Sequence, residues 1–191
     1  MRVALLADIH GNDTALKVVL EDIEAQGGVN AYWILGDLVA LGPHPVQVLQ
    51  ILSVLPDTRF IRGNTDRYVV SGDRPSPSIE DAKRNSELMG ALVEVANTFA
   101  WTQGMITAGG WLPWLQELPI DTRISLPNGT RFLGVQASPG RDDGSGIAPH
   151  MNSAEIASLL RDCDAELVCV GHPLPFRAQD RWLCTSPIQA R

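Results

Sequence analysis

The chain has 191 residues, of which 45% are hydrophobic and 19% are charged, and this composition excludes a globally disordered protein. Its 22 acidic and 15 basic side chains give a formal net charge of −7. Because a nucleic-acid backbone requires a basic surface, extended nucleic-acid binding is not expected. The length suits one hydrophobic core, so we expect residues 1–191 to form a single domain.

Membrane insertion and disulfide bonding are not indicated by the sequence. No apolar run approaches the roughly 20 residues of a membrane-spanning helix. The apolar N-terminal stretch is too short for a signal peptide, since Asp8 interrupts it. The cysteines, Cys163, Cys169 and Cys184, are odd in number and include no C-x-x-C pair. We therefore expect a cytoplasmic protein.

The first third of the chain alternates between strand-like and helix-like segments. Short apolar strands are predicted at residues 3–8, 31–35 and 58–61. A helix is predicted from Asn12 or Asp13 to about Gln26, and a second one begins at Pro45. This order predicts parallel strands joined by right-handed crossovers.

The rest of the chain predicts a different arrangement. Asn128-Gly129, between strand-like runs at 121–126 and 131–136, indicates a β-hairpin. The other predicted elements are a loop at 72–78, a helix at 79–107, a short helix around 113–115, a glycine-rich surface loop at 142–146, a helix at 153–161 capped by Ser153, a strand at 166–170 and a last strand within 177–185.

Potential metal ligands follow four of the predicted strands. Asp8 and His10 follow the first, Asp37 the second, Asn64 the third and His172 a later one. Since sites in open α/β sheets form at the carboxyl ends of strands, we expect these side chains to converge. Carboxylate, imidazole and amide groups suit divalent metals. Two such ions about 4 Å apart, bridged by Asp37, would clamp a phosphate ester and activate a water.

With these motifs the chain resembles the calcineurin-like metallophosphoesterases, in particular their short prokaryotic, diadenosine-tetraphosphatase-like branch. The family's D-x-H-G-N, G-D and G-N-x-D blocks stand here at residues 8–12, 36–37 and 63–66. The resemblance covers nearly the whole chain. It implies an α/β fold, a four-layer αββα sandwich of two mixed β-sheets flanked by helices. It also implies hydrolysis of phosphate mono- or diesters on a small phosphorylated substrate.

The resemblance further implies divalent metal cofactors, one or two ions per chain, drawn from Mn²⁺, Fe²⁺ or Fe³⁺, Zn²⁺ and Ni²⁺. Carried over residue by residue, one ion would be held by Asp8, His10, Asp37 and position 174, and the other by Asp37, Asn64, Gln136 and His172. Two of these positions depart from the family's histidines, because Gln136 and Leu174 stand there. We therefore expect fewer than two ions, with the carboxylate-rich Asp8 and His10 site the fuller.

Several roles stay open at this point. The resemblance implies catalytic roles for Asp37, Asn64 and Asn12 and substrate contacts for Asn12 and Asn64, although Asn12 equally suits a helix cap. His44 follows the Asp37 strand and either lines the substrate cleft or lies in a solvated loop. Thr65 replaces a histidine that protonates the leaving group in many relatives.

These substitutions leave two other functions open. The first is a degenerate, non-catalytic relative that binds a phosphate ligand or a metal ion as a regulatory module. The second, a nuclease subunit, is disfavoured by the acidic charge. Relatives in the short branch usually continue with further strands, so a C-terminal segment is expected to be missing. The sheet edge exposed in this way would favour a homo-oligomer.

Overall fold

The computed structural model describes residues 1–148, 150–172 and 188–189. Its elements in chain order are β1 (Val3–Leu6), α1 (Asp13–Ala25), β2 (Ala31–Leu35), α2 (Pro45–Leu52), β3 (Thr58–Ile61), α3 (Asn64–Ser71), α4 (Ile79–Arg84), the 3₁₀ helix η1 (Ser86–Leu88), α5 (Met89–Ala108), α6 (Leu112–Gln116), β4 (Asp121–Ser125), β5 (Arg131–Val135), α7 (Ser153–Leu159), β6 (Leu167–Val170) and β7 (Ile188–Gln189).

The first sheet is parallel, with the order β1-β2-β3, as the strand–helix alternation predicts. Its central strand β2 is buried along its whole length. Successive side chains of a strand point to opposite faces, and β2 follows that rule. Tyr32 and Ile34 join the core under the helices, whereas Ala31 and Trp33 join the core between the two sheets.

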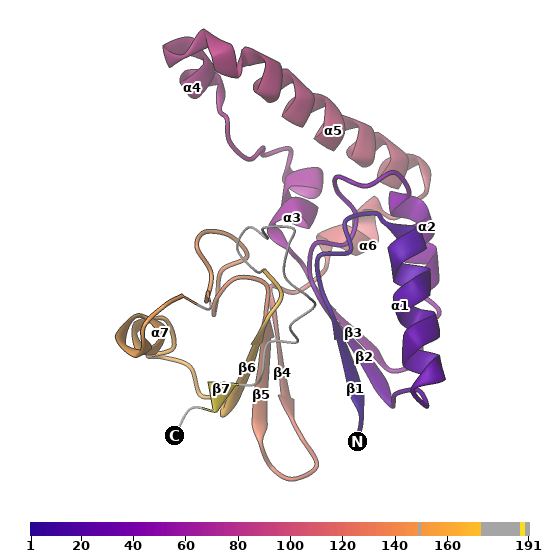
Figure 1. Cartoon of the computed structure of the whole chain (residues 1–191). Helices are drawn as coiled ribbons and strands as arrows, with labels where there is room; N and C mark the ends of the chain where they lie inside the picture. Colours follow the sequence, from indigo (N-terminus) through magenta and orange to yellow (C-terminus); the bar gives the residue numbers. More distant parts are fainter. Residues whose placement is uncertain (149, 173–187, 190–191) are drawn as a thin grey trace.

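The second sheet has the order β4-β5-β6-β7 and mixes antiparallel and parallel pairs. The hairpin predicted at Asn128-Gly129 is confirmed, because β4 and β5 pair antiparallel and Gly129 has the positive φ of 88° that such turns require. The sheets pack through Trp33 and Phe132, whose ring centroids lie 4.4 Å apart. Figure 1 shows the resulting layers, α7, second sheet, first sheet, and then α1 with α2, which confirms the αββα sandwich.

Three details of the predicted helices are wrong or incomplete. The single helix expected at 79–107 is interrupted at Asn85, whose backbone is extended and whose side chain accepts a hydrogen bond from Glu87 N. The cap of α7 is Asn152 rather than Ser153, since Asn152 Oδ1 accepts from two backbone N–H groups of the first turn. Helix α3 was not predicted.

The last predicted strand, at 177–185, and Cys184 lie outside the described residues.

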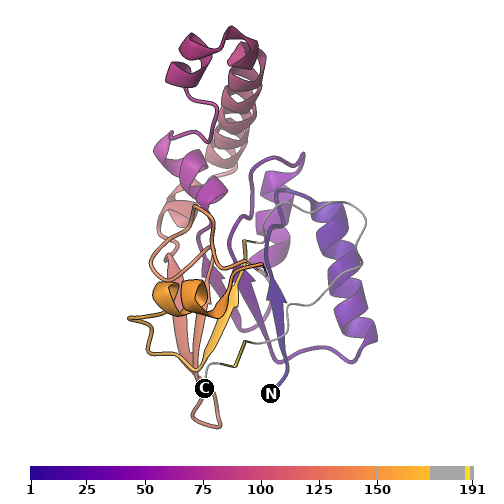
Figure 2. The same cartoon turned by 60° about the vertical axis from the view of Figure 1, so that its left-hand side comes forward.

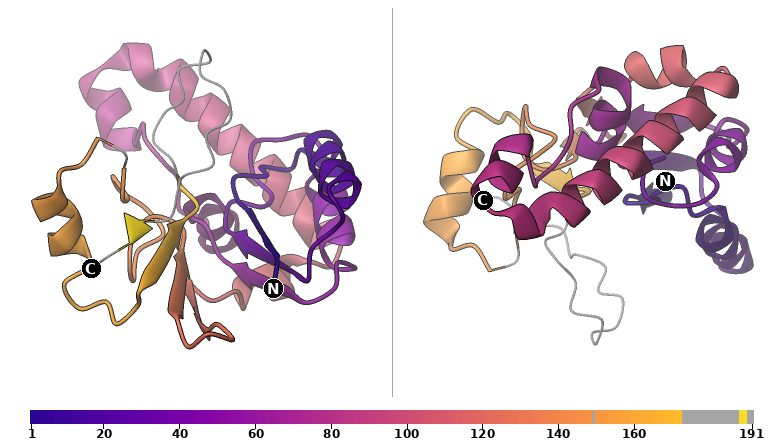
Figure 3. Two further views of the ribbon diagram at one scale, coloured as in Figure 1. Left: turned by 60° about the horizontal axis from the view of Figure 1, so that its bottom comes forward. Right: turned by 90° about the horizontal axis from the view of Figure 1, so that it is seen from above.

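Helices α4 and α5 form an arm above the two sheets (Figure 2). Seen from above, α5 runs across the molecule from α4 toward α2 (Figure 3, right). Its C-terminal half packs against the body through Phe99 and Ile106, which are fully buried, whereas Trp101 on the same helix is 47% exposed. Within the described residues, no helix combines the length and the hydrophobicity needed to cross a membrane.

Candidate metal centre

The loops that follow β1 and β2 are joined by backbone hydrogen bonds at the carboxyl edge of the first sheet. Asp8 N donates to Gly36 O at 3.2 Å, His10 N donates to Asp37 O at 2.9 Å, and Gly11 N donates to Leu38 O at 2.8 Å. These bonds continue the parallel pairing of the two strands past its end. Residues that lie far apart in the sequence are thereby fixed side by side.

Three of the predicted ligands have an unusual backbone conformation. Asp8, His10 and Asp37 have φ values of 52°, 48° and 55°, in the left-handed region that non-glycine residues rarely occupy. Each such residue costs on the order of 1–3 kcal/mol, and the surrounding structure must impose it. The backbone bonds between the two loops do so here. Strain of this kind concentrates at functional sites.

The structure brings together a compact group of metal-ligand atoms. One ligand atom each from Asp8, Asp37 and His172 lies within 4.8 Å of the other two. His10 is close to the same group, with its Nε2 atom 3.8 Å from Asp37 Oδ2. The family resemblance implies that Asp8 and His172 hold different ions. In the folded chain they share one cluster around Asp37.

The two carboxylates of this cluster repel each other. Burial, and then the nearby charge of Asp37, raise the pKa of Asp8 to about 6, while the His10 imidazole opposes the rise. Two partly dehydrated carboxylates at such a distance favour a bound cation, which would relieve both effects. The electrostatics of the cluster therefore fit a divalent metal.

Two amide oxygens beside the carboxylates support the same conclusion. Asn64 Oδ1 and Gln136 Oε1 are both buried, and neither has a hydrogen-bond partner among the described residues. Buried polar atoms nearly always have a partner, so each orphan requires an explanation. Oxygen and imidazole donors together form a set that suits a hard or borderline divalent cation. The residues present therefore fit a metal ion.

Gln136 directly follows β5, is completely buried, and contacts two of the candidate ligands. Its backbone oxygen accepts from His172 N at 2.7 Å, and its Nε2 atom lies 3.5 Å from Asp8 Oδ1. A Cβ atom on Gly36 or Gly171 would overlap its Oε1 atom, so both glycines leave the room that this side chain occupies. Leu174, the other substituted position, lies outside the described residues.

Two residues that follow Asn64 fix the position of Asp37. Thr65 donates two hydrogen bonds to Asp37 Oδ1, from its backbone N–H at 2.9 Å and from its hydroxyl at 2.8 Å. Asp66, which is fully buried, accepts from the backbone N–H groups of Leu38 and Gly63 at 2.9 and 3.0 Å. Burial, and then the charge of Asp37, raise the pKa of Asp66 to about 7.

Asp66 has no predicted role, although its position in the sequence carries a signal for one. Asp66 lies three residues after Gly63, which is the spacing of a capping box at the start of a helix. That spacing would have predicted both helix α3 and the bond from Asp66 back to Gly63 N. The hydrogen bonds that Leu38 N and Val39 N donate to Asp66 Oδ1 follow from the tertiary structure alone.

Asn12 and His44 lie at the first turns of neighbouring helices. Asn12 Oδ1 accepts from Ala15 N at 3.0 Å, which confirms the alternative of a helix cap for this residue. His44 precedes α2, and its Nδ1 atom lies 2.7 Å from Asp13 Oδ1. The catalytic role of Asn12 and the substrate contacts of both residues stay predictions.

The prediction of a surface loop at residues 142–146 is wrong for its first residue. Asp142 is only 5% exposed, because two arginines from the neighbouring segment enclose its carboxylate. Arg62 Nη2 lies 3.2 Å from Asp142 Oδ2, and Arg67 Nε donates to both carboxylate oxygens. These ion pairs fasten the loop after Gln136 to helix α3, which begins with Asn64.

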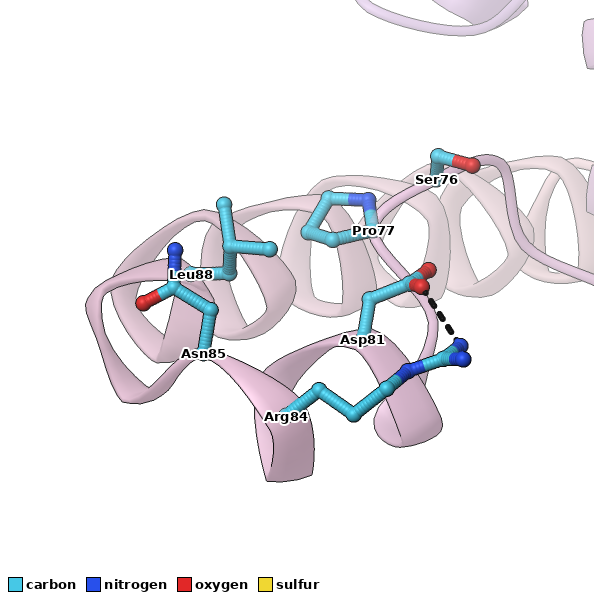
Figure 4. Close-up of a pocket in the computed structure, with 6 residues that line it drawn as sticks. All are labelled: Ser76, Pro77, Asp81, Arg84, Asn85 and Leu88. Atoms are coloured by element: carbon cyan, nitrogen blue, oxygen red, sulfur yellow. Dashed lines mark hydrogen bonds and ion pairs between the residues drawn. The ribbon is translucent and has the colours of Figure 1, made fainter.

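A separate hollow of about 530 Å³ lies beside the arm and contains none of the candidate ligands (Figure 4). Its polar side includes an ion pair between Asp81 Oδ1 and Arg84 Nη2 at 3.1 Å. The lining residues are Ser76, Pro77, Asp81, Arg84, Asn85 and Leu88. All of them come from the α3–α4 connection and the tip of the arm, so this hollow does not belong to the metal centre.

Comparison with known proteins gives results at three levels. The sequence profile described as calcineurin-like phosphoesterase matches residues 1–174. Symmetrical bis(5'-nucleosyl)-tetraphosphatases of Cronobacter sakazakii and Escherichia coli K12 are each 35% identical to the chain over 72 residues, which are 37% of this chain. The matched segment spans only about a quarter of the length of these relatives, 25% and 26%.

Two solved structures have a similar fold. A metallophosphoesterase from Sphaerobacter thermophilus is 26% identical, with a TM-score of 0.62 over 89% of this chain and 59% of its own. A hypothetical protein from Pyrococcus horikoshii OT3 is 23% identical, with a TM-score of 0.68 over 88% of this chain and 68% of its own. The second comparison concerns the fold alone.

Proposed function

The chain belongs to the calcineurin-like phosphoesterase family, and from this premise we propose that it hydrolyses phosphate mono- or diesters with the help of divalent metal ions. The observation that carries the proposal is the convergence of Asp8, Asp37 and His172, whose ligand atoms lie within 4.8 Å of one another. His10, Asn64 and Gln136 would complete the metal environment.

The chain's own residues have separable tasks in this proposal. Asp8, Asp37 and His172 would hold an ion, which when bound supplies Lewis acidity toward the phosphoryl oxygens and activates a water. Thr65 occupies Asp37 Oδ1 with two hydrogen bonds and so leaves Oδ2, the oxygen that is 3.8 Å from His10, for the metal. Asn64 presents a buried amide oxygen without a partner, which suits a ligand or a substrate contact.

A bound metal ion would also explain how a protein with a net charge of −7 can bind an anionic substrate. A phosphate ester is an anion, and the protein as a whole repels it. Two carboxylates neutralise one divalent ion, and each further ion would make the centre positive. The proposed metals are Mn²⁺, Fe²⁺ or Fe³⁺, Zn²⁺ and Ni²⁺, one or two per chain.

The relatives suggest which substrates to try first. Symmetrical bis(5'-nucleosyl)-tetraphosphatases share 72 aligned residues with this chain, so a dinucleoside tetraphosphate is a reasonable candidate beside simple esters. The test is hydrolysis of p-nitrophenyl phosphate, bis(p-nitrophenyl) phosphate and diadenosine tetraphosphate with each metal in turn. We expect metal-dependent turnover of at least one substrate. Asp37→Ala should abolish this turnover. The control variant Asp164→Asn, which changes an exposed carboxylate, should preserve it.

A second candidate function is a phosphate-binding or metal-binding module without turnover. The position of Gln136 favours it, because a neutral amide fills the place of an imidazole ligand and lies within reach of Asp8. Nucleotide binding measured by calorimetry, without hydrolysis under any of the metals above, would establish this function. Turnover by the purified protein would exclude it.

We also propose that the protein is cytoplasmic and that it assembles into homo-oligomers. Within the part of the chain that the structure describes, Cys163 and Cys169 form no disulfide, and a reducing compartment would preserve such thiols. Cell fractionation tests the location, and light scattering tests the oligomeric state.

A further inference from the structure

A paired histidine and aspartate lie beside the metal centre and are not part of it. His44 Nδ1 is 2.7 Å from Asp13 Oδ1, and Lys17 Nζ is 2.6 Å from the other oxygen, Asp13 Oδ2. The Asp13 side chain is 9% exposed, whereas that of His44 is 49% exposed. Hydrogen bonds, from Lys17 first and then from His44, lower the pKa of Asp13, so this carboxylate is ionised.

The pair is attached directly to the loops that carry the candidate ligands. His44 N donates to Gly11 O at 2.9 Å, and Gly11 follows His10 in the chain. Gly42 lies so close to His10 O that a Cβ atom there would overlap it. Between Asp37 and His44, Leu41 is 57% exposed with a φ of 78°, a strained conformation for a branched residue. His44 therefore lies at the same edge of the sheet as the candidate metal ligands.

The geometry of the pair suits the transfer of a proton. A carboxylate that accepts the Nδ1 proton fixes the imidazole tautomer and stabilises its protonated form. The second nitrogen, Nε2, is then the one that can meet a substrate. The His44 ring, which would act as the acid, is exposed to solvent, and the Asp13 carboxylate that orients it is buried. A general acid that is positioned by a carboxylate requires this arrangement.

Among the described residues, no other histidine is paired in this way. The sequence contains four histidines. His10 and His172 lie in the candidate ligand cluster, and His150 is exposed in the loop before α7. Thr65 already donates its hydroxyl to Asp37, and a threonine hydroxyl does not act as an acid near neutral pH.

We propose that His44, positioned by Asp13, donates a proton to the leaving group of the phosphate ester. The inference rests on the proposed function. In this step the bond between phosphorus and the leaving oxygen breaks, and its electron pair stays on that oxygen. The oxygen takes the Nε2 proton, and the imidazole then recovers a proton from water. The attacking water supplies the oxygen that phosphorus gains and releases its proton to solvent.

The test compares two esters that differ in their need for that proton. p-Nitrophenolate leaves easily as an anion, whereas phenolate is a much stronger base and profits from protonation. For His44→Asn we expect kcat/KM to fall on the order of 100-fold with phenyl phosphate and less than about 10-fold with p-nitrophenyl phosphate. Asp13→Asn keeps a hydrogen-bond acceptor without the charge and should shift the ratio of the two rates in the same direction.

A control variant separates this role from general damage. His150→Asn removes another exposed histidine and should leave the ratio of the two rates unchanged. Equal losses on the two esters in His44→Asn, or no loss on either, would overturn the inference while the proposed function stands. A wild-type protein that hydrolyses neither ester with any metal would overturn both.

Discussion

Thr65 donates both its backbone N–H and its hydroxyl to a single oxygen of Asp37, at 2.9 and 2.8 Å. Thr65 is itself only 7% exposed, so this contact is shielded from water. Thr65, which replaces a histidine of the family, thus orients the candidate metal ligand Asp37. Groups that orient metal ligands in this way typically change metal affinity by 10- to 100-fold when they are mutated.

We therefore expect Thr65→Val, which keeps the shape and removes the hydroxyl, to weaken metal binding roughly tenfold. Titration calorimetry with Mn²⁺ measures the change in dissociation constant. Thr65→Ser retains the hydroxyl and serves as the matched control. If the Thr65→Val and Thr65→Ser proteins bind the metal equally well, the Thr65 hydroxyl does not support Asp37 in the way proposed.

Substitution of Asp66 should change the stability of the fold rather than the chemistry of the site. Its carboxylate accepts backbone N–H bonds from Leu38, Val39 and Gly63, and Asn in its place would turn one acceptor into a donor facing a donor. We expect Asp66→Asn to lower the free energy of unfolding by about 1–3 kcal/mol. Urea unfolding followed by fluorescence measures it. The exposed Asp164→Asn should change stability by less than about 0.5 kcal/mol.

Metal affinity should depend on pH through Asp8. Its folded-state pKa of about 6 lies above the ordinary value of 3.8, so the metal-free protein still holds a proton there at mildly acidic pH. The metal must displace that proton, and apparent affinity should therefore fall as the pH drops through about 6. The same shift makes the metal-free fold lose stability as the pH rises from about 4 to 6.

Calorimetry in buffers of different ionisation enthalpy tests this expectation by counting the protons released at pH 5.5 and at pH 7.5. We expect more proton release at the lower pH. Equal proton release at the two values would show that Asp8 is already ionised throughout this range.

The number of metal ions should be less than two per chain. Gln136 brings no charge and no imidazole, whereas Asp8 and Asp37 bring charge to a shared cluster. Elemental analysis of protein purified without chelator measures the number. Gln136→His, alone and together with Leu174→His, should raise it. Two equally tight ions in the wild type would contradict the argument.

The sequence by itself determined the local elements and the identity of the candidate ligands. Apolar runs fixed β1, β2 and β3, Asn12 and Pro45 marked the starts of helices, and Asn128-Gly129 marked the hairpin, because each signal acts over a few residues. Strand ends also pointed to the ligands, since parallel strands finish at one edge of a sheet.

Only the tertiary structure decided how those ligands are grouped and supported. Asp8 and His172 meet because β5, paired with β6, brings the Gln136 backbone against His172 and its side chain toward Asp8. The contacts between Leu38 and Asp66, between Arg67 and Asp142 and between His44 and Asp13 likewise join residues 28 to 75 positions apart. No local pattern encodes such contacts, because the partners are distant in the sequence and meet only when the chain has folded.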